Sequence, residues 1–136
     1  MSNFRLSVSS KFNELWRYNL VVVCELCSAE GERIDLHSKE SFIAPVGSNL
    51  ASPPSDYIDD RTISIECGEG DHLNILVYVV PHTLPTSNDI FKIRPFSLNI
   101  KVDSDGKTIL NQQVDINQWS GKNLTLNRIG ANDKKE

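Results

Sequence analysis

Two of the three cysteines lie three positions apart, in the run Cys24-Glu-Leu-Cys27, which is the spacing of metal knuckles and redox pairs. A tetrahedral metal site needs two more thiolate or imidazole ligands, for which Cys67 and His37 are the candidates. Residues three apart on a strand face opposite sides, so the two sulfurs cannot share an ion without a bulge. A redox pair normally begins a helix after a strand. We therefore expect no metal and no cofactor, and we interpret the cysteines as buried small apolar residues.

The run Asp103-Ser-Asp-Gly106 resembles the start of a calcium-binding loop. A complete EF-hand loop needs a glutamate at its last position, where this chain has Val114. Aspartate and glycine also tolerate the positive φ angles of a tight hairpin. The run is therefore predicted to be a hairpin turn.

A second calcium hypothesis rests on the acidic residues of two loops, which are Asp56, Asp59, Asp60, Glu69 and Asp71. β-Sandwiches of the C2 type hold calcium with loop aspartates, and the composition here is similar to theirs, although no C2 motif is present. A solvated acidic rim is the other interpretation. The alternative function that remains open is therefore a small-molecule, lipid or calcium-binding C2-like module.

The three histidines, His37, His72 and His82, are scattered along the chain. Serines and aspartates are also present, but no G-x-S-x-G motif or other local signature supports a nucleophile with its base. We therefore expect that the protein is not an enzyme.

The formal net charge is −4 and the isoelectric point is about 5.3. A nucleic-acid partner is not expected, because phosphate backbones bind basic surfaces. The longest apolar runs, residues 20–23 and 73–80, are too short to cross a bilayer. The N-terminus has no basic region followed by an apolar core, so no secretory signal is predicted. Together with the odd number of cysteines, this favours a cytoplasmic location.

The strands that would position these residues are predicted from alternation with period 2. Phe96, Leu98, Ile100 and Val102 alternate with polar residues, which places the apolar side chains on one face of a strand. Residues 20–26 and 73–80 are apolar on both faces, which is typical of central strands. Weaker patterns predict further strands at residues 4–8, 33–36, 62–67, 108–116 and from 124. Residues 68–71 are predicted to form a turn. Residues 13–19 are predicted to contain a turn or a short helical piece.

Seven or eight strands with almost no helix predict an all-β fold. The turn chemistry and spacing favour an antiparallel two-layer β-sandwich, with a closed β-barrel as the runner-up. The length of 136 residues fits one domain, which we place at residues 1–129, followed by a flexible C-terminal tail at 130–136.

Two irregular stretches, residues 37–60 and 81–95, interrupt the strand pattern, and prolines stiffen the second one. Stiffness lowers the ordering cost of binding, so we predict that His82, Leu84 and Asn88 contact a partner. For Trp119, capping one end of the core is the favoured interpretation, and a binding hot spot is the alternative that makes it a further candidate contact. The predicted function is a non-catalytic β-sandwich that binds a protein partner or serves as a structural component of a larger assembly. A homo-oligomer remains open.

Overall fold

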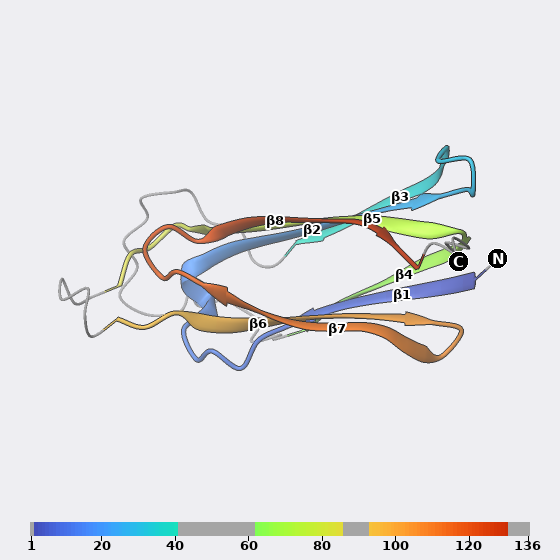
Figure 1. Ribbon diagram of the computed structural model, residues 1–136. Helices are drawn as coiled ribbons and strands as arrows, with labels where there is room; N and C mark the ends of the chain where they lie inside the picture. Colours follow the sequence, from blue (N-terminus) through green and yellow to red (C-terminus); the bar gives the residue numbers. More distant parts are fainter. Residues whose placement is uncertain (1, 41–61, 86–92, 131–136) are drawn as a thin grey trace.

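Two antiparallel sheets lie face to face in this protein (Figure 1). The computed structural model describes residues 2–40, 62–85 and 93–130. Each sheet has four strands and open edges, so the predicted sandwich is confirmed and the barrel is not formed. Sheet A has the order β4 (Thr62–Gly70), β1 (Ser2–Ser9), β6 (Phe96–Ser104), β7 (Lys107–Ile116). Sheet B has the order β3 (Arg33–Glu40), β2 (Tyr18–Cys27), β5 (His72–Pro81), β8 (Lys122–Ile129).

The core is formed by the inward rows of both sheets. The predicted row of β6, with Phe96, Leu98, Ile100 and Val102, is at most 6% exposed. It faces the even-numbered residues of β2 and the odd-numbered residues of β5, which are buried in the same alternating manner. Burying one such side chain contributes about 1.5–3 kcal/mol, so this interface between the sheets is the main source of stability.

The β6–β7 hairpin turn confirms the interpretation of the Asp-Gly pair. Asp105 has φ of 51° and Gly106 has φ of 80°. The left-handed backbone is accessible to these two residue types at low cost, whereas a branched residue would be strained there. The short helical piece is also confirmed, as the 3₁₀ segment η1 at Leu15–Arg17.

Several predicted strand boundaries differ from the structure, and two of them differ most. Residues 37–40, assigned to a loop, extend β3, and residues 68–70, assigned to a turn, extend β4. β3 is an edge strand whose residues are nearly all exposed, so it lacks the alternation that predicts a strand. β4 continues because its ladder with β1 reaches the pair Ser2 and Gly70, with a register shift between Phe4 and Arg5.

The two ends of the sandwich differ in what they carry (Figure 1). One end holds the β2–β3, β4–β5 and β6–β7 turns together with the start of β1 and the end of β8. The opposite end, called here the η1 end, holds η1, the residues that follow β5, and the β7–β8 connection. Across the described ranges, the structure has no helix with the length and hydrophobicity that a membrane span requires.

Candidate functional site

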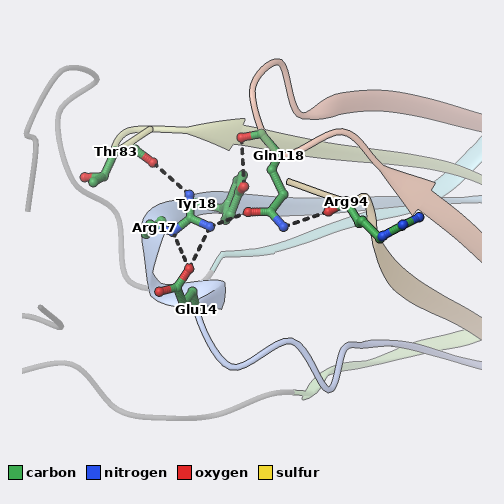
Figure 2. A network of polar contacts seen from close by, with 6 residues as sticks. All are labelled: Glu14, Arg17, Tyr18, Thr83, Arg94 and Gln118. Carbon is green, nitrogen blue, oxygen red and sulfur yellow. Dashed lines mark hydrogen bonds and ion pairs between the residues drawn. The ribbon is translucent and has the colours of Figure 1, made fainter. Parts of the chain in front are cut away.

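A buried arginine organises the η1 end. The Arg17 residue is 1% exposed, and its guanidinium contacts three separate segments (Figure 2). Its Nη2 donates to Gln118 Oε1 at 2.6 Å and lies 2.9 Å from Glu14 Oε1. Its Nη1 donates to the Thr83 carbonyl at 3.4 Å. Because Gln118 Nε2 in turn donates to the Arg94 carbonyl at 2.7 Å, this one network joins η1 to both connections of the η1 end.

Aromatic rings surround the same guanidinium. Its Cζ lies 5.6 Å from the ring centroid of Phe12 and 5.3 Å from that of Tyr18, within the range of cation–π attraction. The Tyr18 hydroxyl donates to the Gln118 carbonyl at 2.9 Å. Burial raises the pKa of Tyr18 to about 12, against the opposing effect of the nearby Arg17 charge. The buried polar groups of Arg17 and Tyr18 therefore have partners within the protein, and we call this arrangement the closed cluster.

His82 belongs to this closed cluster and is 2% exposed. Its Nε2 lies 2.7 Å from the Trp16 carbonyl, and since a carbonyl only accepts, Nε2 donates. In the neutral ring, Nδ1 then accepts from the Thr83 hydroxyl at 2.8 Å. His82 therefore holds the residues after β5 against η1 and has no surface to offer a partner.

The other three predicted contact residues have different environments. Leu84 comes directly after His82 and Thr83 in the chain, and it is 50% exposed. Trp119 is half-buried, and its indole Nε1 is buried without a hydrogen-bond partner among the described residues. Asn88 lies outside the described residues. The structure thus brings His82 and Trp119 to the same end of the sandwich. His82 is buried there and holds neighbouring segments together, whereas Trp119 is half-buried.

The outer face of sheet A is polar. Its central row pairs Arg5 with Glu66 and Asp103, and pairs Ser7 with Ser64 and Lys101 across the neighbouring strands. Arg5 Nε and Glu66 Oε2 form an ion pair at 2.7 Å, with both side chains more than half exposed. This face is typical of a sheet in contact with water.

The middle of the outer face of sheet B is apolar, whereas its edge strands place Glu40 and Ser38 of β3 and Asn123 and Thr125 of β8 beside it. In its two central strands Val21 lies opposite Tyr78 and Val23 lies opposite Leu76, and these four side chains are half-buried. The exposed apolar residues of this sheet add to them, with Ile34 at 48%, Leu36 at 46% and Val80 at 37%. We call this surface the apolar patch; it consists of Val21, Val23, Ile34, Leu36, Leu76, Tyr78 and Val80.

Two of the charges beside the apolar patch, Glu25 and Arg33, are paired with each other. Glu25 Oε2 accepts from Arg33 Nε at 2.8 Å, and Glu25 Oε1 accepts from Asn74 Nδ2 at 2.9 Å. The Asn74 and Arg33 hydrogen bonds hold the pKa of Glu25 below its usual range. Because Glu25 and Arg33 already have partners, they do not require an ion pair with another protein.

Sheet A carries a groove of about 670 Å³ near the η1 end. Its lining is mostly hydroxyl and amide groups, with one ammonium group and one stacked aromatic pair. Phe12 and Phe96 form that pair, with ring centroids 4.4 Å apart and planes 5° from parallel. The lining residues are Ser9, Ser10, Lys11, Phe12, Phe96, Ser97, Asn99, Asn111 and Gln113.

The predicted metal ligands do not form a complete set in the described structure, although Cys24 Sγ and Cys67 Sγ lie 3.1 Å apart. Cys24, Cys27 and Cys67 are buried, as the sequence predicts. Asp71 is paired with His72 at 2.7 Å, and His37 with Asp35 at 3.2 Å. Among the residues that the structure describes, no three His, Cys, Asp or Glu side chains are grouped to hold a metal ion, and residues 56, 59 and 60 lie outside them.

Comparisons with known proteins do not assign a family. No protein-family model matches the chain, and no curated protein matches it. The chain is similar to the crystal structure of a DUF4425 family protein from Bacteroides ovatus ATCC 8483, with a TM-score of 0.43 and 14% sequence identity. That similarity covers 93% of this chain and 92% of the other.

Proposed function

We propose that this protein is a non-catalytic β-sandwich that binds a protein partner through the apolar patch of sheet B. The observation that carries the proposal is that the middle of the outer face of sheet B is apolar, whereas the central row of the outer face of sheet A is polar. Contiguous exposed apolar surface is unusual on a soluble monomer and marks interaction sites. A cytoplasmic location is part of the proposal, on the sequence grounds given above.

The strand composition supports the same proposal. β2 and β5 are apolar on both faces, a pattern of strands that are covered on both sides. Sheet A covers only one of these faces. A partner that covers the other face would complete the burial that the sequence of β2 and β5 indicates.

The expected partner is a protein with a flat apolar surface, such as another sheet. The patch is a sheet face, and sheets pack on one another at about 10 Å through interdigitated side chains. The bordering Glu25 and Arg33 are already paired with each other, which favours an apolar partner over a charged one. Leu84 lies at the η1 end and is not needed for this contact.

Charges placed on the patch test this proposal. We expect the double variant Leu36→Lys/Val80→Lys to bind a co-purified partner at least about tenfold more weakly, a loss of about 1.4 kcal/mol, because an ammonium would be desolvated at an apolar interface. Both sites are exposed, so the melting temperature should stay within a few degrees. Affinity is measured by calorimetry, and stability by thermal unfolding.

The matched control carries the same charges on the other sheet. Ser7→Lys/Asn99→Lys lies on the outer face of sheet A and should bind the partner normally. Weakened binding by the control, with normal binding by Leu36→Lys/Val80→Lys, would contradict the proposal. A second copy of the chain as the bound partner would appear as a dimer in light scattering.

A second candidate function, binding of a small uncharged polar molecule, is favoured by the groove on sheet A. Amides and hydroxyls both donate and accept, which suits a hydroxyl-rich ligand such as a neutral sugar. In nuclear magnetic resonance titrations with maltose and maltotriose, the side-chain amide signals of Asn99 and Gln113 should shift, and the variant Asn99→Ala/Gln113→Ala should remove the binding. Unchanged spectra at millimolar sugar would contradict this candidate.

A further inference from the structure

Two thiols from opposite sheets meet in the core. Cys24 lies on β2 of sheet B and Cys67 lies on β4 of sheet A, 43 positions apart in the sequence. Their sulfur atoms are 3.1 Å apart, and Cys24 donates its hydrogen to Cys67 Sγ. The two residues are 0% and 1% exposed. The third thiol, Cys27, is on the same strand as Cys24 and contacts Asn74 Nδ2 at 3.6 Å.

We propose that Cys24 and Cys67 are a modification site, at which reaction with a low-molecular-weight disulfide joins the two sheets by a covalent disulfide. The two sulfurs already face each other at a distance that a small side-chain adjustment closes. No such approach is recorded for Cys27 in the described structure. The proposal does not depend on the proposed function, because both residues lie inside the sandwich.

The reaction is two successive thiol–disulfide exchanges. The thiolate of Cys67 attacks one sulfur of the small disulfide, which forms a mixed disulfide and releases one small thiol. The thiolate of Cys24 then attacks the Cys67 sulfur, which forms the Cys24–Cys67 bond and releases the second small thiol. Two protein thiols are oxidised and one small disulfide is reduced to two thiols, which take up the two protons that the protein thiols give up.

Cys67 is the residue expected to react first. The hydrogen bond that it accepts from Cys24 lowers the pKa of the Cys67 thiol, while donating that bond raises the pKa of Cys24. β4 is an edge strand of sheet A, paired with β1 only. Edge strands open at a lower cost than central ones, so Cys67 can reach the oxidant by local opening or before folding is complete.

Refolding in a glutathione buffer tests this inference. The full chain is refolded from denaturant with reduced and oxidised glutathione, and then with reductant alone, and free thiols are alkylated before peptide mapping. We expect the oxidised product to lose two hydrogen atoms in mass, to link Cys24 with Cys67, and to keep Cys27 alkylated. The bond closes a loop of 43 residues in the unfolded chain, so the melting temperature should rise by roughly 10 °C over the reduced form.

The variants separate this site from accidental oxidation. Cys27→Ala should form the same bond, whereas Cys24→Ala and Cys67→Ala should not. The wild-type peptide map decides the matter even where a variant fails to fold. Three free thiols after oxidative refolding, a bond that includes Cys27, a stable glutathione adduct, or an oxidised form that melts no higher than the reduced one would each overturn the inference.

Discussion

The variant Ile100→Asp is expected not to fold. Ile100 is 0% exposed on β6, a central strand of sheet A, where it lies opposite Val8 of β1. An ionised carboxylate at this position would have no partner in the apolar core. Burying such a group costs several kcal/mol, which is comparable with a total stability of about 5–15 kcal/mol. Thermal unfolding followed by circular dichroism should show no cooperative transition.

The neighbouring residue is the matched control. Lys101 lies on the opposite, polar face of β6, so Lys101→Asp introduces the same side chain one position away. We expect it to change the free energy of unfolding by less than about 1 kcal/mol, because its ion pair with Asp103 is long, at 4.0 Å, and partly exposed. Equal tolerance of both variants would mean that the register of β6 is wrong.

The variant Arg17→Ala is expected to lower the free energy of unfolding by about 3–5 kcal/mol. The truncation removes the hydrogen bonds that the guanidinium donates to the Thr83 carbonyl and to Gln118 Oε1, and it opens a cavity beneath Phe12 and Tyr18. The loss is large because these hydrogen bonds are at least half-buried, where water replaces them poorly. Chemical denaturation with urea measures the difference.

A second arginine provides the comparison for Arg17. Arg33 also pairs with a glutamate, Glu25, but its side chain is 57% exposed. Arg33→Ala should therefore cost less than about 1 kcal/mol. Arg17→Lys keeps the charge but loses the planar fork that contacts three segments, so its stability should lie between those of the wild type and Arg17→Ala. Similar losses for Arg17→Ala and Arg33→Ala would contradict the assigned role of the buried network.

The strands of the core could be predicted from the sequence because their signal is local. In β6 the alternation of Phe96, Leu98, Ile100 and Val102 with polar residues reports directly which face is covered. β3 was predicted only in part, since an edge strand exposed on both faces leaves no such alternation. Lys39 of β3 reaches the Ser64 carbonyl of β4 at 3.0 Å, a contact between strands that the sequence does not connect closely.

The buried cluster at the η1 end could not be predicted in the same way. Arg17 is an isolated cation beside a turn, and its burial depends on Thr83 and Gln118, which are 66 and 101 positions away. The apolar patch is visible in the sequence as the second apolar face of two central strands. Residues 20–26 and 73–80 predict strands covered on both faces, whereas the described sandwich covers one. The Cys24–Cys67 approach likewise depends on the packing of two sheets.

The ends of β1 and β8 make the chain suited to circular permutation. Ser2 lies opposite Gly70 and Ile129 lies opposite Leu73, so the short turn between β4 and β5 holds the first and last strands close together. A short linker could therefore join them, and a new start could be cut at Asp105-Gly106. Such a rearranged chain would keep both sheets while changing the order in which their strands leave the ribosome.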